Sequence, residues 1–229
     1  MKAMILAAGR GERLRPLTDH TPKPLLVAGG KPLIAHLLAA LATQGFREIV
    51  INLAHLGDQL RAAVGDGNRY GVRVQYSPEP DSALETAGGI RHALPLLGDA
   101  PFLVVNGDIA TDFPFAELMQ QPAARSAHLV MVPNPPHKAR GDFVLMDGLL
   151  RPDDGHGHTF AGIGVYRPEF FAGVTPGRFP LLPLLLQDMA AGQISGQLYE
   201  GFWLDVGTAQ RLELADRYYS GRTGYPPRP

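Results

Sequence analysis

The chain has 229 residues, a formal net charge of −1, 45% hydrophobic residues and no cysteine. The near-zero charge argues against a nucleic-acid or membrane-surface binder that works by bulk electrostatics, since such domains carry a basic excess. No apolar stretch approaches the roughly 18 residues of a membrane helix. The absence of cysteine excludes disulfides, thiolate metal sites and cysteine nucleophiles, and it fits the reducing cytoplasm, where we expect the protein.

The first half of the sequence alternates strands with helices. Short apolar runs predict strands, and apolar residues at helical spacing predict the helices between them. The expected strands span residues 3–7, 48–53, 72–76, 102–106 and 128–132, and the expected helices span residues 32–43, 57–64, 86–97 and 115–121. Such alternation is typical of an α/β fold with a Rossmann-like, mostly parallel sheet and helices on both faces.

The alternation stops after Pro133. Strands are expected at residues 143–146, 149–151, 159–166, 196–199 and 203–206, and helices at residues 180–191 and 208–219. Thr208 is the predicted N-cap of the last helix. We expect one domain over residues 1–220 with a mixed second half, followed by a disordered tail over residues 221–229.

A glycine loop rich in cations follows the first expected strand, where ligands bind in open parallel sheets. Gly9 and Gly11 permit consecutive N–H groups to face phosphate oxygens. Leu14 stands where the dinucleotide fingerprint has its third glycine, so the loop does not predict NAD binding. Without the surrounding cations, a solvated surface turn would explain the two glycines equally well. The cations are Arg10, Arg13, Arg15 and Lys23.

This loop resembles the signature of the sugar-phosphate nucleotidyltransferases, G-x-G-x-R-x-x-P-x-T followed by P-K-P. The matching residues are Gly9, Gly11, Arg13, Pro16, Thr18 and Pro22-Lys23-Pro24. The resemblance covers nearly the whole chain and implies the nucleotide-diphospho-sugar transferase fold. It also implies that a nucleotidyl group passes from an NTP to a sugar 1-phosphate with release of pyrophosphate. The residues from Ala8 to Gly11, Arg10 among them, would hold the triphosphate with Arg13, and Lys23 would neutralise charge near the α-phosphate.

Two aspartates follow later strands. Asp108 ends the turn Asn106-Gly107-Asp108, and Asp205 lies in the run Trp203-Leu204-Asp205-Val206-Gly207-Thr208. Taken alone, the first is a common turn sequence and the second is an ordinary entry to a helix. The resemblance implies that Asp108 and Asp205 together bind Mg²⁺, a cation that prefers carboxylate and phosphate oxygens. The resemblance also implies that Asn106 contacts the nucleotide.

The segment from Glu79 to Ile90 resembles the family's base-binding segment, E-x-x-x-L-G-T-A-G. It departs from that pattern at Glu85, where glycine is usual. The Glu79 carboxylate could accept N3–H of uracil or thymine, or N1–H and N2–H of guanine, but not the N3 acceptor of cytosine. Backbone groups of Thr86, Ala87 and Gly88 would contact the remaining edge of the base. A solvated surface role for Glu79 is the alternative.

The second half resembles the part of the family that lines the sugar pocket. The resemblance rests on Gly141-Asp142-Phe143 and on the strand that contains Gly162 and Ile163. The family's E-K-P motif, whose lysine contacts the sugar phosphate, is absent between these segments. The compact length, the run Leu84-Glu85-Thr86-Ala87-Gly88-Gly89 and the missing E-K-P motif resemble family members that use UTP and N-acetylmuramate 1-phosphate, a sugar phosphate of peptidoglycan recycling, so the resemblance implies these substrates. Its lactyl carboxylate requires a cation, for which the candidates are Lys138, Arg140, Arg151 and Arg178.

Other functions stay open at this point. One is transfer from GTP to mannose 1-phosphate, and another is transfer from UTP or dTTP to glucose 1-phosphate. A third, of a different class, is a regulatory module that binds a nucleotide without catalysis. The expected partners are small-molecule substrates only, neither nucleic acid nor membrane, and the expected assembly is a monomer or a weak homo-oligomer.

Overall fold

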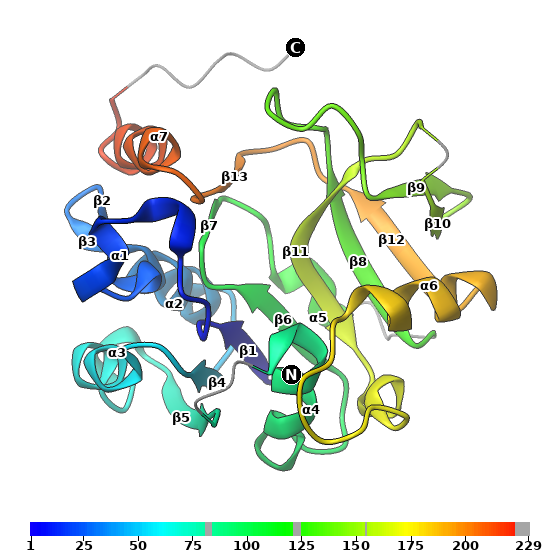
Figure 1. Cartoon of the computed structure of the whole chain (residues 1–229), viewed down its shortest axis with the longest axis horizontal. Helices are drawn as coiled ribbons and strands as arrows, with labels where there is room; N and C mark the ends of the chain where they lie inside the picture. Colours follow the sequence, from blue (N-terminus) through cyan, green and yellow to red (C-terminus); the bar gives the residue numbers. More distant parts are fainter. Residues whose placement is uncertain (81–83, 121–124, 154, 223–229) are drawn as a thin grey trace.

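The computed structural model describes residues 1–80, 84–120, 125–153 and 155–222. A nine-stranded sheet runs through the molecule (Figure 1). Its first part consists of four parallel strands, in the order β5 (Arg73–Pro78), β4 (Glu48–Leu53), β1 (Ala3–Leu6) and β6 (Phe102–Asn106). The carboxyl ends of these four strands therefore lie along one edge of the sheet, as the alternating pattern predicts.

The second part of the sheet is mixed. It continues with β11 (Thr159–Tyr166), β8 (Ala127–Val132), β12 (Ile194–Leu198), β10 (Leu149–Pro152) and β9 (Phe143–Met146). Strand β11 is antiparallel to both β6 and β8, whereas β12 is parallel to β8. The register of β11 against β8 shifts between Phe160 and Gly164, which marks a bulge in β11.

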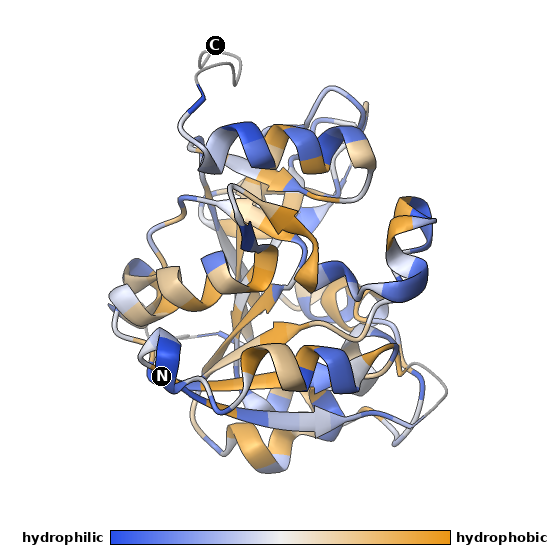
Figure 2. Ribbon diagram, turned by 90° about the vertical axis from the view of Figure 1, so that its left-hand side faces the viewer, coloured by the Kyte–Doolittle hydropathy of each residue, from blue (hydrophilic) through white to orange (hydrophobic). Residues whose placement is uncertain are grey.

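Helices cover both faces of the sheet because the buried strands carry apolar side chains on both faces. In β1, Ala3 and Ile5 pack with α2 (Leu33–Thr43), α3 (Gly57–Val64) and α5 (Ala116–Gln120). Met4, which points the other way, packs with α4 (Glu85–Leu97) and α6 (Leu182–Ala190). Figure 2 shows the apolar strands in orange with helices to either side.

A third, smaller apolar cluster joins the two ends of the chain. It includes residues of β2 (Val27–Ala28), β7 (Ile109–Thr111), β13 (Trp203–Asp205) and α7 (Ala209–Tyr219). β2 pairs with the short strand β3 (Lys31–Pro32), and β13 pairs with β7. In Figure 1, α7 lies beside β2, above the strands of the first half.

Most predicted elements agree with the structure to within two residues at each end, and Thr208 is the N-cap of α7 as expected. Several short elements were not expected. They are η1 (Glu12–Leu14), α1 (Leu17–His20), η2 (Lys23–Leu25), η3 (Asn68–Tyr70), η4 (Pro168–Phe171), β2, β3 and β7. Such elements are too short to show apolar periodicity. Residue 121 of the expected helix and residues 223–229 of the expected tail lie outside the described residues. Among the described residues, no helix is both long and apolar enough to span a membrane.

Candidate active site

Polar groups from four parallel strands meet in a cavity of about 270 Å³ at the carboxyl edge of the sheet. Asn52 lies near the end of β4, Glu79 directly follows β5, and Asn106 ends β6. The glycine loop after β1 forms another wall through Ala8, Gly9 and Gly11. This is where an open parallel sheet binds ligands.

The backbone at Gly11 requires glycine. Its φ is +65°, and a Cβ there would lie 2.9 Å from Cγ2 of Thr18. The Gly11 carbonyl accepts hydrogen bonds from the Thr18 hydroxyl and from the Leu14 N–H, each at 2.9 Å. These contacts fold the loop over itself, so that its cations surround a second recess of about 410 Å³. The recess is lined by Arg10, Gly11, Glu12, Arg13, Lys23 and Gly207.

Lys23 connects this recess with the first cavity. Its ammonium group forms an ion pair with Asp108, and only 12% of its side chain is exposed. Asp108 is held by a tight turn, in which the Gly107 N–H donates to the Leu6 carbonyl at 2.8 Å. A Cβ at Gly107 would lie 2.7 Å from that same oxygen. Because glycine has no Cβ, the turn can pack this closely on the end of β1.

The two candidate metal ligands lie side by side, Asp205 at the end of β13 and Asp108 in the turn that directly precedes β7. Asp205 is paired in register with Ile109, the residue after Asp108. The Val206 N–H donates to the Asp108 carbonyl at 2.8 Å. The Asp108 carboxylate is paired through Oδ2 and the Asp205 carboxylate through Oδ1. Within the described residues, the other oxygen of each carboxylate has no hydrogen-bond partner.

A buried arginine orients Asp205. Arg211, on the first turn of α7, donates from Nη1 to Asp205 Oδ1 at 2.6 Å and lies within 2.6 Å of His137 Nε2. A Cβ at Gly207 would lie 2.6 Å from Nη2 of Arg211 and 2.8 Å from Nη2 of Arg13. Two guanidinium groups therefore converge beside Gly207. Sequence reasoning missed Arg211, and its only local signal is its place three residues after the N-cap.

The Glu79 carboxylate is anchored on both oxygens. Oε1 accepts from Asn52 Nδ2 at 2.7 Å, and Oε2 accepts from the Leu84 N–H at 3.1 Å. Asn52 in turn accepts the Ala7 N–H at 2.7 Å, so it ties Glu79 to the glycine loop. A carboxylate has about four acceptor positions, which leaves Glu79 able to accept from a ligand. Sequence reasoning missed Asn52, although a polar residue in an apolar strand was a usable signal.

A third cavity, of about 540 Å³, adjoins the first. Leu6, Glu85, Thr86 and Asn106 line both cavities. Its other walls are mainly apolar and aromatic, and they consist of Val104, Asp142, Phe143, Phe160, Gly162, Tyr166, Pro180, Leu181, Leu182 and Leu185. Burial raises the pKa of the Tyr166 phenol, so this group stays neutral. Asp142 is held by Lys138 Nζ at 2.5 Å and by the Phe160 N–H at 2.8 Å.

The structure brings most predicted site residues to these three cavities, and Asp205 lies beside them through its pairing with β7. Besides Asp205, four predicted residues do not line a cavity. Ala87 and Ile163 are fully buried, and Gly141 packs on the backbone of Gly157. The Gly88 N–H donates to the Phe179 carbonyl at 3.0 Å, so it already has a partner.

Comparisons with known proteins identify relatives of this chain. The model of the nucleotidyl transferase family matches residues 2–145. The chain is 56% identical over 223 residues to the N-acetylmuramate α-1-phosphate uridylyltransferase of Neisseria meningitidis, covering 94% of this chain and 96% of that protein. The enzyme of the same description from Caulobacter vibrioides is 35% identical, with coverages of 93% and 95%. A mannose-1-phosphate guanyltransferase of Aspergillus fumigatus is 34% identical over 90% of this chain and 61% of its own length.

Solved structures share the fold. A Bacillus anthracis protein assigned as a glucose-1-phosphate thymidylyltransferase, in complex with sucrose, superposes with a TM-score of 0.85. It is 22% identical and covers 98% of this chain and 96% of its own. HddC of Yersinia pseudotuberculosis in complex with GMP-PN superposes with a TM-score of 0.82 at 20% identity, with coverages of 95% and 99%. The expected α/β fold is thereby confirmed.

Proposed function

This chain belongs to the nucleotidyl transferase family, and from that membership we propose that it transfers a uridylyl group from UTP to N-acetylmuramate α-1-phosphate. The products are the UDP-sugar and pyrophosphate. The observation that carries the proposal is 56% identity, over nearly the full length of both chains, to an enzyme described by this reaction. The two adjoining cavities support it, because they offer separate space for a nucleotide and a sugar that meet at Asn106.

Uracil fits the polar end of the first cavity. The anchored Glu79 carboxylate retains acceptor capacity for N3–H of the base. The same carboxylate repels the N3 acceptor of cytosine. Guanine also presents N–H donors, so Glu79 by itself does not separate UTP from GTP.

The sugar phosphate needs no catalytic base. Its second pKa is about 6, so it is largely dianionic at neutral pH and is itself the nucleophile. One of its oxygens bonds to the α-phosphorus of UTP, the bond from that phosphorus to the bridging oxygen breaks, and pyrophosphate leaves with the electron pair. The difficulty is that two anions must approach. Two like unit charges 4 Å apart repel by about 4 kcal/mol at an effective dielectric constant of 20.

Cations of the glycine loop offset the repulsion between the two anions. Arg13 has no ion-pair or hydrogen-bond partner within the described residues, which leaves its guanidinium available for the β- and γ-phosphates. Backbone N–H groups of Gly9, Arg10 and Gly11 would donate hydrogen bonds to the same phosphates. Lys23 lines both the first cavity and the recess, so its ammonium group lies where charge on the α-phosphate grows. Catalysis then consists of positioning and electrostatic stabilisation.

The donor set at Asp108 and Asp205 fits Mg²⁺. Mg²⁺ takes one or two carboxylates and completes its shell with substrate phosphates and water. In the described part of the chain, Asp108 and Asp205 each keep one carboxylate oxygen without a hydrogen-bond partner, and Asp205 pairs with the residue that follows Asp108. When bound by these carboxylates, Mg²⁺ would supply positive charge that offsets the repulsion between the reacting phosphates. Asp108→Asn tests this assignment, and a loss of turnover in Mg²⁺ below tenfold, or about 1.4 kcal/mol, would contradict it.

A matrix of nucleotides against sugar 1-phosphates, with pyrophosphate release as the readout, tests the function. We expect turnover of UTP with N-acetylmuramate 1-phosphate. Equal activity with glucose 1-phosphate would contradict the sugar, and turnover of GTP with mannose 1-phosphate would favour the chemistry of the guanyltransferase relatives. Nucleotide binding without any turnover would favour a regulatory module.

Three accompanying predictions concern the cell. The cysteine-free sequence favours the cytoplasm, and the sugar places the reaction in peptidoglycan recycling. We expect a monomer or a weak homo-oligomer, which sedimentation measurements would test.

A further inference from the structure

The charged residues that line the larger cavity within the described part of the chain are both acids, Glu85 and Asp142. Each acid is neutralised by a single cation, Glu85 by Arg178 and Asp142 by Lys138. A sugar phosphate with an additional carboxylate would be repelled by such a lining unless one of these cations also contacts it. The question is which cation can hold two carboxylates at once.

Arg178 sits on a loop that is fastened to the first turn of α4. The Gly88 N–H donates to the Phe179 carbonyl at 3.0 Å, and the Phe179 N–H donates to the Leu84 carbonyl at 2.9 Å. A Cβ at Gly88 would lie 2.2 Å from the Gly177 carbonyl oxygen, so glycine permits this close approach. The backbone on both sides of Arg178 is therefore held against the turn that carries Glu85.

Glu85, which lines the cavity, holds the guanidinium of Arg178. Its Oε1 accepts from Nε of Arg178 at 2.6 Å. Glu85 has a φ of +58° at a position where the family's motif has glycine, a conformation that disfavours a side chain. Glu85 also lines both cavities, so its ion pair holds Arg178, which is not itself a lining residue, next to their shared wall. Despite this backbone conformation, the position carries a side chain, and that side chain holds Arg178.

The geometry of Arg178 leaves room for a second carboxylate. Its Nε serves Glu85, while neither Nη group has a hydrogen-bond partner in the described part of the chain. A guanidinium presents five donors in a planar fork, so the two Nη groups can bind a carboxylate end-on while Nε keeps its partner. The side chain is 73% exposed, which leaves these groups open to a ligand.

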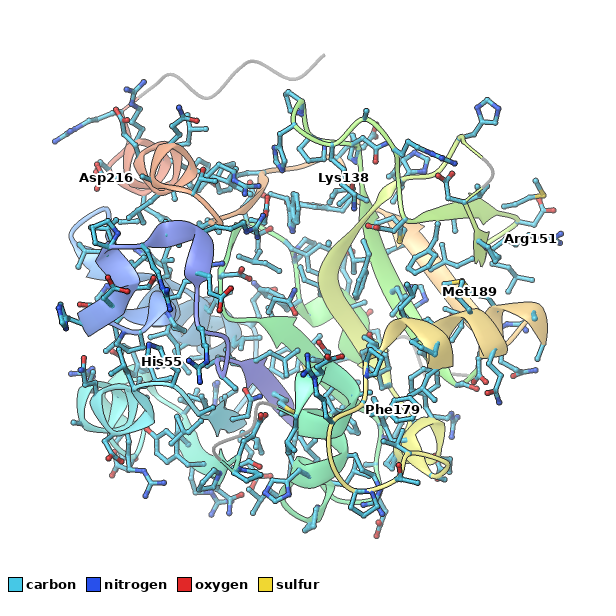
Figure 3. All side chains as sticks on the ribbon, in the orientation of Figure 1. His55, Lys138, Arg151, Phe179, Met189 and Asp216 are labelled. Atoms are coloured by element: carbon cyan, nitrogen blue, oxygen red, sulfur yellow. The ribbon has the colours of Figure 1, made fainter. Side chains whose placement is uncertain are left out.

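The other candidate cations are placed less well. The Lys138 ammonium is a point charge already in contact with Asp142. Arg140 lies 3.8 Å from Asp153, which does not line the cavity, whereas Glu85, the partner of Arg178, does. Arg151 is on β10, and Figure 3 places it far from Phe179, which marks the loop beside α4.

We propose that Arg178 determines sugar specificity by binding the lactyl carboxylate of the sugar 1-phosphate, and that Glu85 positions its guanidinium for this contact. The inference rests on the proposed function, which supplies the carboxylate. Arg178 would thereby distinguish N-acetylmuramate 1-phosphate from the same amino sugar without the lactyl ether.

Steady-state kinetics of the full chain with two sugar phosphates tests the inference. N-acetylmuramate 1-phosphate carries the lactyl group, and N-acetylglucosamine 1-phosphate lacks it. Arg178→Ala should raise KM for the first by about tenfold or more, as expected for lost charge-assisted hydrogen bonds, and change KM for the second by less than about twofold. Arg178→Lys should recover part of the loss, because it keeps the charge without the fork.

Arg140→Ala is the matched control, since it removes an equally exposed arginine whose partner, Asp153, does not line the cavity, and it should leave both KM values unchanged. Equal changes for both sugars in Arg178→Ala, or no change, would overturn the inference. The inference would also be overturned if Lys138→Ala, and not Arg178→Ala, raised KM selectively for N-acetylmuramate 1-phosphate. If the wild-type protein does not turn over N-acetylmuramate 1-phosphate at all, the proposed function fails first, which is a distinct result.

Discussion

Replacing Gly162 by alanine would test how tightly the floor between the two cavities is packed. Gly162 lies in the bulged part of β11 with a φ of +69°. A Cβ there would lie 2.3 Å from Nδ2 of Asn106 and 3.0 Å from Cδ1 of Ile109. Real Cβ atoms do not approach side chains this closely, so Asn106 must move away from the position where it lines both cavities.

The expected loss of stability has two parts. Holding alanine at a positive φ costs about 1–2 kcal/mol. Forcing a methyl group into a packed interior costs about 1–3 kcal/mol more. The sum is about 2–5 kcal/mol, and a chain of this length loses about 2–4 °C in Tm for each kcal/mol, which gives a decrease of about 4–20 °C. A displacement of Asn106 by about 1 Å would lower kcat/KM by about 100-fold.

Gly148→Ala separates the two parts. Gly148 has a φ of +74°, but a Cβ there would meet no atom within 4 Å. This control therefore carries the backbone strain without the collision, and it lies outside the residues that line the cavities. Thermal unfolding and pyrophosphate release should be measured on both variants. Similar Tm and kcat/KM for the two variants would refute the argument from close packing at Gly162.

Three other changes have expected outcomes. Thr208→Ala removes the acceptor for the Arg211 N–H, 3.3 Å away, and should lower the free energy of unfolding by about 0.5–2 kcal/mol; an unchanged denaturant midpoint would contradict the cap. Asn52→Ala leaves Glu79 and the Ala7 N–H without their buried partner. It should therefore lower the free energy of unfolding by about 1–3 kcal/mol and raise KM for UTP. An unaltered KM would contradict the placement of Glu79 at the base. Burial lowers the pKa of His128, so the unfolded chain binds its proton more readily. The stability that His128 contributes is therefore complete above about pH 6.5 and declines as the pH falls below that value. Urea unfolding between about pH 7 and about pH 5 should show a smaller decline in the free energy of unfolding for His128→Gln than for the wild type. Equal declines would exclude His128 as a source of this pH dependence.

Local pattern was enough to predict the first half of the fold. The strands Glu48–Leu53 and Phe102–Asn106 match their predicted limits because continuous apolar runs bounded by turn residues are local signals. The glycine loop was equally recognisable, since Gly11 and the residues that fold against it lie within twelve positions of one another. The resemblance of these motifs to a family, which the comparisons then showed, also depended on local spacing.

Contacts between distant parts of the chain decided the rest of the site. The three-residue strand β7 is too short for a periodic signal, yet its pairing with β13 places Asp205 beside Asp108. Asn52 meets Glu79 because β4 and β5 are neighbours, and Arg178 meets Glu85 because a loop packs on α4. Sequence alone therefore determined which residue types were available and which local elements carried them. Only the packing of the whole chain determined which of them face one another, because such contacts depend on how sheets and helices stack and not on the propensities of neighbouring residues.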